Sequence, residues 1–505
     1  MTTPSLQNFW NDLHYVDIHF RDVWQIELQS DFAINVSQKK NISAQEFYIF
    51  IPQSLQVNKE SYSKDDFYKD RTNLIRFKTP EFMLAELLIP TNAQSPFVRI
   101  QHALAHAPKE EEVSFIENEL KLLGNVVRSS LRTAVRYIVD RITAREMDSV
   151  KEEIIRFCDD VHEFRKAFFA LQKESKQAWN IESINTHFTY VDEFISRSID
   201  YYCMGLLATL REVHLPHTND ADRKLCEIIN EEKAYRKKEY NEQEPTKTFS
   251  EQGETVLFRK GLLNKFVLDA LLLDLEKRAW RQRYGFIVGS LAAAIAMLVY
   301  VIVLLFTVGT NLLVINSISF LLLTVFVYVI KDRIKDSLKT LFHKHAFRWF
   351  ADYTTNIRSY SGKAIGKLKE SFSFIDREDV PEEIIDMQKQ ALGEDFPFLL
   401  RYEDVIYYKK EMILTKSPER VRSRKKKLHN IFLFNIHVLL EKASDPLETH
   451  LLLDAHQKLK IVLFPKVYHI HVIVKNSAGA KSEIKMFRVV IDKRGIKRVE
   501  HVASK

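Results

Sequence analysis

A run of 47 residues, from 284 to 330, contains no Asp, Glu, Lys or Arg, although 28% of the chain is charged. A helix needs about 20 apolar residues to cross the hydrocarbon core of a bilayer. The run is too long for one span and long enough for two. Because backbone polar groups inside a membrane must be satisfied within the chain, we expect each span to be helical.

The only polar, glycine-containing interruption of this run is Thr307-Val308-Gly309-Thr310-Asn311. It divides the run into predicted helices over residues 284–307 and 311–330, which the short turn makes antiparallel neighbours. Basic residues flank the run on both outer sides, namely Lys277, Arg278, Arg281, Arg283, Lys331, Arg333, Lys335 and Lys339. The positive-inside rule then predicts a multi-pass protein of the cell inner membrane with cytoplasmic N- and C-termini.

Small residues recur every four positions on the first predicted span, at Gly285, Gly289 and Ala293. Such a row lets another helix approach closely. The pattern fits packing against the second span of the same chain and self-association into a homo-oligomer equally well. Neither span carries an ionisable side chain, which argues against proton-coupled transport but leaves a pore built from several copies as an alternative.

The chain before the apolar run predicts a β-rich part followed by a helical part. Alternating apolar residues and scattered prolines indicate a β-rich N-terminal domain over residues 1–107. Helical periodicity indicates an antiparallel helical bundle over residues 108–215. One of its helices carries a heptad seam, formed by Val150, Ile154, Phe157, Val161, Phe164, Phe168 and Leu171. An intermolecular coiled coil is the alternative for this seam.

We expect a charged linker over residues 216–255 and then a juxtamembrane helix over residues 256–283 that continues without a break into the first span. A cytoplasmic helical connector is predicted over residues 331–399, and it includes a short helix, Pro381–Leu392, with the acidic Glu382 and Glu383 in its first turn. From residue 400 to 505, apolar alternation between short turns predicts an antiparallel β-rich domain. The fold class is therefore an α+β membrane protein with β-rich N- and C-terminal domains, a helical bundle and a two-helix transmembrane hairpin.

Charge is uneven around the apolar run. Residues 1–283 contain 39 Lys+Arg and 44 Asp+Glu, a net of −5, and residues 331–505 contain 35 and 23, a net of +12, which together give +7. The densest basic cluster consists of Arg420, Arg422, Arg424, Lys425, Lys426 and Lys427. Beside a membrane it is expected to bind anionic lipid headgroups, at about 1 kcal/mol per cation. Nucleic acid is the weaker interpretation, because the cluster has no aromatic residue for base stacking.

No motif points to an enzyme or to a cofactor. The 12 glycines form no G-x-G-x-x-G, no G-x-x-x-x-G-K-[ST] and no G-x-S-x-G. His469 and His471 share one face of a predicted strand, but no third metal ligand can be assigned, and a polar sheet face is the better explanation. The three cysteines are not spaced as a disulfide framework and suit a reducing compartment.

A cytoplasmic domain, a long helix into the membrane, a short external turn and a second span are similar to the plan of the two-helix magnesium-channel family. The similarity ends with that plan. The Gly-Met-Asn of that family is absent from the turn, where this chain has Val308-Gly309-Thr310-Asn311, and a further 175 residues follow the second span. The resemblance implies no function for this chain.

Three functional hypotheses follow. The first is a membrane-anchored sensor, scaffold or assembly/effector protein that contacts membrane lipids and whose protein partners the sequence does not identify. The second is a subunit of an oligomeric ion channel or pore. The third is a membrane-anchored enzyme with a site assembled in a β domain from residues distant in sequence. The lack of catalytic motifs favours the first.

Overall fold

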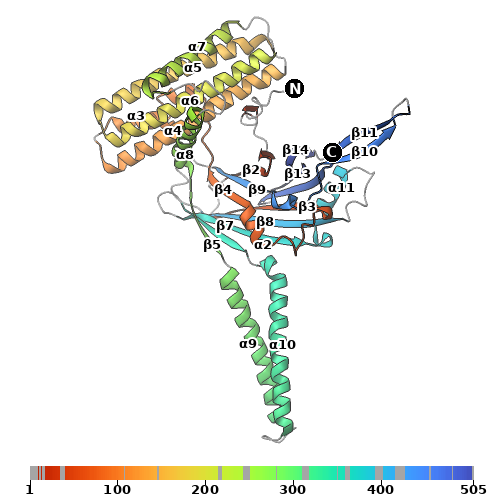
Figure 1. The fold of residues 1–505 in the computed structure, drawn as a ribbon. Coiled ribbons are helices and arrows are strands. Elements are labelled where there is room, and N and C mark those ends of the chain that lie inside the picture. Colours follow the sequence, from red (N-terminus) through yellow and green to blue (C-terminus); the bar gives the residue numbers. More distant parts are fainter. Residues whose placement is uncertain are drawn as a thin grey trace.

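A computed structural model of the chain shows an α+β protein made of a helical bundle, a β sandwich and a long helical hairpin that projects from the sandwich (Figure 1). The β-rich character expected at both ends of the chain is present. The structure describes residues 9–10, 13, 18–33, 40–106, 108–144, 147–213, 219–242, 251–279, 281–309, 318–349, 351–358, 364–392, 402–415, 427–453, 457–479 and 481–502.

The bundle is built from helices whose apolar stripes face one another. They are α3 (Pro96–Leu104), α4 (Glu110–Thr143), α5 (Met147–Ala178), α6 (Glu182–Val213), α7 (Asn219–Glu239) and α8 (Glu251–Leu268). A helix with one apolar stripe excludes water from it only by packing against other helices. The predicted seam from Val150 to Leu171 is buried in this core, so it packs within the chain. The predicted charged linker includes α7 and the start of α8.

Within the described residues, most strands form two antiparallel sheets that pack face to face. The larger has the order β14-β13-β12-β3-β8-β7-β6-β5 and the smaller the order β1-β2-β9-β4. Their bounds are β1 (Ile18–Asp22), β2 (Gln25–Ala33), β3 (Lys40–Pro52), β4 (Arg71–Phe77), β5 (Asp274–Ala279), β6 (Tyr353–Arg358), β7 (Ala364–Ile375), β8 (Glu403–Thr415), β9 (Lys427–Asn435), β12 (Tyr468–Ala478), β13 (Lys481–Asp492) and β14 (Gly495–Val502).

Both sheets combine strands from the two ends of the chain. β3 lies between β8 and β12, with Phe47 opposite Tyr408 on one side and Val474 on the other. β9 lies between β2 and β4. The sequence assigned residues 1–107 and 400–505 to separate domains, whereas the structure joins them in one sandwich. Strand pairing over such separations depends on tertiary packing and leaves no local pattern in the sequence.

Aromatic rings fill the space between the sheets. The Phe67 ring lies 4.3 Å from that of Phe372 and 4.9 Å from that of Tyr408, and the Phe47 ring lies 4.9 Å from that of Phe432. The outer face of the larger sheet is covered by the predicted short helix, α11 (Glu382–Leu392). The core of the bundle continues into the ends of β4, β7, β8 and β9, so the bundle and the sandwich share one apolar cluster.

Two expectations for the segments beside the apolar run are corrected by the structure. The juxtamembrane helix of residues 256–283 is interrupted, because α8 ends at Leu268 and β5 follows. The helical connector of residues 331–399 contains β6 and β7 as well as helices. The reason is the same for both, since β5 pairs with β6 and β6 with β7 at the edge of the larger sheet. These backbone hydrogen bonds override the helical preference of the local sequence.

Candidate functional site

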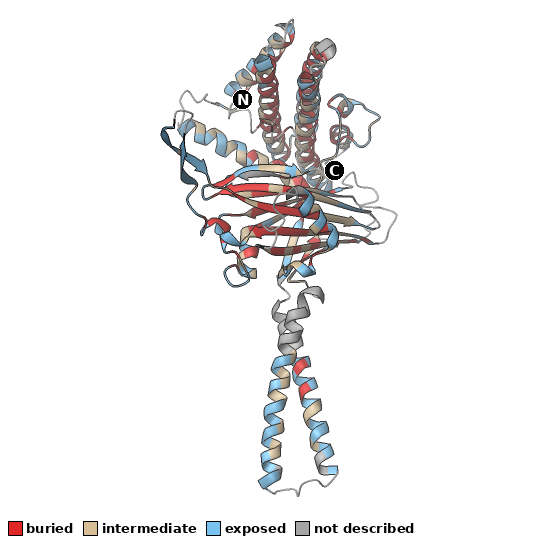
Figure 2. Cartoon of the chain, turned by 90° about the vertical axis from the view of Figure 1, so that its right-hand side faces the viewer, coloured by how far each residue is buried: buried red, intermediate tan, exposed pale blue. Residues whose placement is uncertain are grey.

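Two long helices leave the sandwich side by side, α9 (Arg281–Gly309) and α10 (Ile318–Trp349) (Figure 1). At 1.5 Å per residue, α9 is about 44 Å long. Its apolar side chains are exposed along most of its length (Figure 2), including Leu298, Ile302 and Leu305. A soluble helix buries its apolar face, so this exposure requires lipid or a partner.

The described residues contain one segment that is long and apolar enough to cross a membrane, judged by length and composition. It is Gly289–Phe306 in α9, with a mean hydropathy of 2.6 and 11% of its residues buried. The described part of α10 is apolar from Ile318 to Ile330 and charged from Lys331 onward. Residues 310–317, which include Thr310 and Asn311 of the predicted turn, lie outside the described residues.

Among the described positions of α9, Ala292 and Ala296 are buried, at 0% and 1% exposure, and they lie on a different row from Gly289 and Ala293. Ala293 is exposed, and a Cβ atom on Gly289 would meet no atom within 4 Å. Gly285 belongs to α9, but its surroundings lie outside the described structure. At Gly289 and Ala293 the predicted row is not packed against this chain, and its use in self-association stays a prediction.

Charged residues of α10 lie beside the apolar middle of α9. The two helices are antiparallel neighbours of similar length, so Lys331, about 27 Å from the end of α10 at Trp349, is level with the middle of α9. Its Nζ atom is 3.8 Å from the centroid of the Tyr328 ring. Asp332 lies 3.4 Å from the Nζ atom of Lys335. The zone in which both helices are apolar is therefore the outer half of the hairpin.

The hairpin is attached to the sandwich through the β5–β6 edge. One residue separates β5 from α9, and a short segment that contains Asp352 joins α10 to β6. The Asp352 carboxylate accepts hydrogen bonds from Tyr68 Oη at 3.0 Å and from the Phe372 amide at 2.8 Å, and it pairs with Lys64 Nζ at 2.6 Å. Lys64 and Tyr68 belong to α2 (Lys64–Asp70). This short helix therefore binds the segment that joins α10 to β6.

The strand that leads into α9, β5, contacts the same group of side chains. Lys277 on β5 places its Nζ atom 4.1 Å from the centroid of the Tyr353 ring and 5.7 Å from that of Tyr68. Burial and the nearby Arg71 guanidinium lower the pKa of Lys277. We name Lys64, Tyr68, Lys277, Asp352 and Tyr353 the base network, because together they connect the segments that join α9 and α10 to the sandwich.

A buried polar cluster between the sheets continues inward from the base network. It consists of Arg71 and Asn73 on β4, Glu370 on β7, and Tyr408 and Lys410 on β8. Glu370 accepts hydrogen bonds from Arg71 Nη2 at 2.7 Å, from Asn73 Nδ2 at 2.5 Å and from Tyr408 Oη. The Arg71 guanidinium lies 5.0 Å from the Tyr68 ring, which connects the cluster to the base network. Three donors for one buried carboxylate satisfy the condition under which a buried charge is tolerated.

Lys410 is the unusual member of this buried cluster. Its Nζ atom lies 4.9 Å and 4.8 Å from the ring centroids of Phe47 and Phe432, and 3.5 Å from Asn73 Oδ1. Burial lowers the pKa of Lys410 to about 7, and the Arg71 guanidinium acts in the same direction. Enzymes use lysines of lowered pKa as nucleophiles. Lys410 is only 2% exposed, however, so a substrate would reach it only if the sheets separated.

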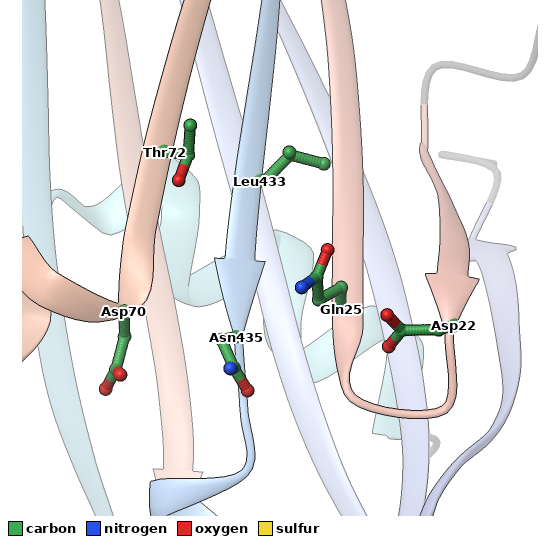
Figure 3. Close-up of a pocket in the computed structure, with 6 residues that line it drawn as sticks. All are labelled: Asp22, Gln25, Asp70, Thr72, Leu433 and Asn435. Carbon is green, nitrogen blue, oxygen red and sulfur yellow. The ribbon is translucent and has the colours of Figure 1, made fainter. Parts of the chain in front are cut away.

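A shallow pocket of about 440 Å³ opens on the outer face of the smaller sheet (Figure 3). Side chains from all four strands of the sheet or their ends face it, namely Asp22, Gln25, Asp70, Thr72, Leu433 and Asn435. Asp70 accepts a hydrogen bond from Tyr62 Oη at 2.7 Å, and burial raises its pKa. These lining residues provide hydrogen-bonding groups but neither a nucleophile with a base nor a cation. Among the described residues, no group of three His, Cys, Asp or Glu could hold a metal.

Most of the predicted lipid-binding cluster lies in a segment that the structure does not describe. Arg420, Arg422, Arg424, Lys425 and Lys426 lie outside the described residues. Lys427 is exposed at the start of β9, and its carbonyl oxygen accepts a hydrogen bond from the Lys78 amide at 2.9 Å. Lipid binding by the cluster stays a prediction.

His469 and His471 share one face of β12, as predicted. His471 is buried, with its Nδ1 atom 3.4 Å from Glu403 Oε1. His469 is half-buried, and burial lowers its pKa. Glu403 is itself fixed by Gln388 on α11, whose Nε2 atom donates to it at 2.6 Å. His471 is therefore linked through Glu403 to α11, whereas the charged groups that act on His469 are those of β13 and β14, namely Arg488, Arg498 and Glu500.

The sequence analysis did not predict the ionic network that lies inside the bundle. Arg165 on α5 donates to Asp192 on α6 at 2.6 Å and to Glu232 on α7 at 2.7 Å, and all three are buried. Arg259 on α8 pairs with Glu193 on α6 at 2.7 Å. One available signal was the position of Asp192 and Glu193 inside an otherwise apolar stripe of α6. The network fixes the mutual rotation of four helices.

Comparison of the chain with protein-family models, with curated proteins and with solved structures found no match.

Proposed function

We propose that the protein is a membrane-anchored sensor, scaffold or assembly/effector protein, in which a bundle and a sandwich on the cytoplasmic side are coupled to a two-helix transmembrane hairpin. The observation that carries the proposal is the exposed apolar surface of α9, which stands clear of the body and joins it directly at β5. This arrangement supports anchoring more strongly than catalysis, because the polar clusters described above are buried between structural elements.

The length of α9 supports insertion. A helix of about 44 Å exceeds the 30 Å hydrocarbon core of a bilayer. Basic residues lie at the end of α9 next to the body and along α10 beyond Ile330. By the positive-inside rule, this distribution favours a cytoplasmic position for the body.

The connections of the hairpin support a coupling role. α8 belongs to the bundle and leads through a short 3-10 helix, Asp269–Leu271, into β5 and then α9. α10 leads into β6 and β7 of the sandwich. A displacement of α8 would therefore act on the hairpin through β5, and the base network would carry it to the sandwich. Binding of a ligand or a partner to the bundle is the kind of event that this path could transmit.

Flotation of the full chain with liposomes, followed by alkaline extraction, tests the anchoring. Leu298, Ile302 and Leu305 lie on one exposed face of α9. Arginine near the centre of a span costs about 2.5–3.5 kcal/mol. Leu298 lies near the centre of Gly289–Phe306, whereas Ile302 and Leu305 lie closer to its end, where a charge costs less. The three arginines together should therefore cost more than about 3 kcal/mol, so we expect the variant to move from the membrane fraction to the soluble fraction.

The matched control replaces Leu257 and Phe258 with Arg. Both side chains are about as exposed as those on α9, but they lie on α8 in the bundle. This control should float like the unchanged chain. Anchoring through α9 is refuted if the triple variant stays in the extracted membranes, or if the unchanged chain fails to float.

An oligomeric pore is the second candidate function, and the charged part of α10 favours it. Charges level with the apolar middle of α9 would be costly in lipid but tolerated around a water-filled lumen. In a ring of several copies, α9 would place its apolar side chains in lipid, and α10 would place its charged side chains in the water-filled lumen. Ion flux should then appear in liposomes that contain the full chain, and Arg333→Glu should change its cation-to-anion selectivity. Absence of flux from verified oligomers would remove this candidate.

A further inference from the structure

A second hairpin projects from the sandwich and is isolated from both sheets. It is formed by β10 (Leu447–Leu453) and β11 (Leu459–Pro465), which pair only with each other among the described residues. Except for the half-buried Val462, every residue of the two strands is exposed. A two-stranded hairpin has little stability of its own in water. Its persistence as a free element therefore indicates that something covers it.

The strand register gives this hairpin one wholly uncharged face. Residues opposite each other in an antiparallel pair point to the same side. Leu451 lies opposite Ile461, and Leu453 opposite Leu459. Together with Leu447 and Leu463, these side chains form an exposed apolar face in which Thr449 is the only polar residue. We name it the β10–β11 face.

The opposite face of the hairpin is mixed, because Glu448, His450 and Lys460 share it with Leu452, Val462 and Phe464. Glu448 pairs with Lys466 at 3.6 Å, and the His450 ring lies edge-on to the Phe464 ring at 4.9 Å. Lys460 also belongs to this side, opposite Leu452. The charged residues of the two strands therefore lie on this side of the hairpin, and the β10–β11 face carries none.

We propose that the β10–β11 face packs against the same face of a second copy of this chain. The hairpin extends from the sandwich away from α9 and α10 (Figure 1), so a bilayer that holds those helices does not reach it. A second copy meets the face without burying an unpaired charge, because neither copy contributes one. An isologous contact of this kind closes a two-fold dimer.

The size of the β10–β11 face predicts the strength of the contact. Burying a Leu or Ile removes about 60–120 Å² of apolar surface from water. Six such side chains on each copy, about 60% exposed on average, give a total of roughly 450–900 Å². A standard specific interface buries about 1,200–2,000 Å². The hairpins alone therefore form a weak dimer.

Anchoring in one membrane would strengthen this contact. Copies anchored in the same bilayer hold their hairpins at the same height and at a high effective concentration. This step rests on the proposed anchoring, whereas the self-complementary face does not. We expect dimers in membranes and dissociation on dilution in detergent.

Cysteine cross-linking of the full chain in its membranes tests the proposal. Thr449→Cys places a thiol in the centre of the β10–β11 face, and His450→Cys, the matched control, places one on the opposite face of the same strand. A short bis-maleimide should cross-link Thr449→Cys at least 10-fold more than His450→Cys. Ile461→Lys, added to Thr449→Cys, should abolish the product, because it buries a charge in each copy.

Equal cross-linking of the two cysteine variants, or no effect of Ile461→Lys, overturns the proposal. Insertion of the hairpin into lipid is the competing outcome, and a Leu451→Trp variant whose emission is quenched by brominated lipid would also overturn it. Flotation of the same samples is scored separately. A chain that does not float but cross-links selectively at high concentration refutes the anchoring and retains the dimer.

Discussion

Replacing Lys410 with Met should stabilise the protein, and by an amount that depends on pH. The Nζ atom lies between the rings of Phe47 and Phe432 with one weak polar partner, Asn73 Oδ1 at 3.5 Å. Burial lowers the pKa of the amine from 10.5 to about 7. Each unit of pKa difference between the folded and unfolded states corresponds to about 1.4 kcal/mol. At pH 6 and below, Lys410 therefore lowers the free energy of unfolding by about 5 kcal/mol.

The sign follows from the proton balance. Between pH 7 and 10.5 the unfolded chain holds a proton on Lys410 that the folded chain lacks, so stability rises with pH in this window. The cost of the buried amine falls from about 5 kcal/mol at pH 6 to about 3 at pH 8.5 and to about 1 at pH 10. Met keeps most of the apolar stem and removes the ionisable group. The advantage of Lys410→Met should decrease along the same curve.

Urea unfolding of the full chain in detergent at pH 6, 8.5 and 10 measures this difference. Lys409→Met is the matched control, because Lys409 is the next residue on β8, is 40% exposed and pairs with Glu46 at 3.3 Å. It should change stability by less than about 1 kcal/mol at each pH. A gain for Lys410→Met that does not vary with pH, or a loss at pH 6, would refute the assignment of a lowered pKa to a buried amine.

Two further substitutions test the bundle. Arg165→Met leaves the buried Asp192 carboxylate without its guanidinium and should cost about 3–5 kcal/mol in urea unfolding, whereas Lys166→Met, on the exposed side of the same turn, should be nearly neutral. Gly205→Ala places a Cβ atom within the Phe9 ring and should cost about 1–3 kcal/mol. In a chain that already carries Phe9→Ala, Gly205→Ala should cost much less. A double-mutant cycle that shows no coupling between the two substitutions would contradict this packing.

Elements that depend on local periodicity were predictable from the sequence. The three long helices α4, α5 and α6 appear where apolar residues recur at helical spacing, and α11 begins with the expected acidic first turn at Glu382 and Glu383. The strands from β12 to β14 match predicted alternating segments and are joined by short turns. In each case one buried face per element is enough to leave a readable pattern.

The arrangement of these elements was not predictable in the same way. β5 contains Glu276, Lys277 and Arg278 in a stretch that continues a helical pattern, and its strand state depends on pairing with β6, which follows more than 70 residues later. The buried cluster shows the same limit, because Arg71, Glu370 and Lys410 meet only after both sheets have formed. Single charged residues in separate strands carry no sign that they will share one site.

Ala279, the last residue of β5, lies opposite Tyr353, the first residue of β6. The whole helical hairpin is thus a very long connection between two adjacent antiparallel strands that a tight turn could join. In topological terms the helical hairpin is an insertion into a fold whose strands pair without it, and its removal would leave every described strand with its neighbours. A short turn between Ala279 and Tyr353 could therefore replace the hairpin without changing the strand order of the larger sheet.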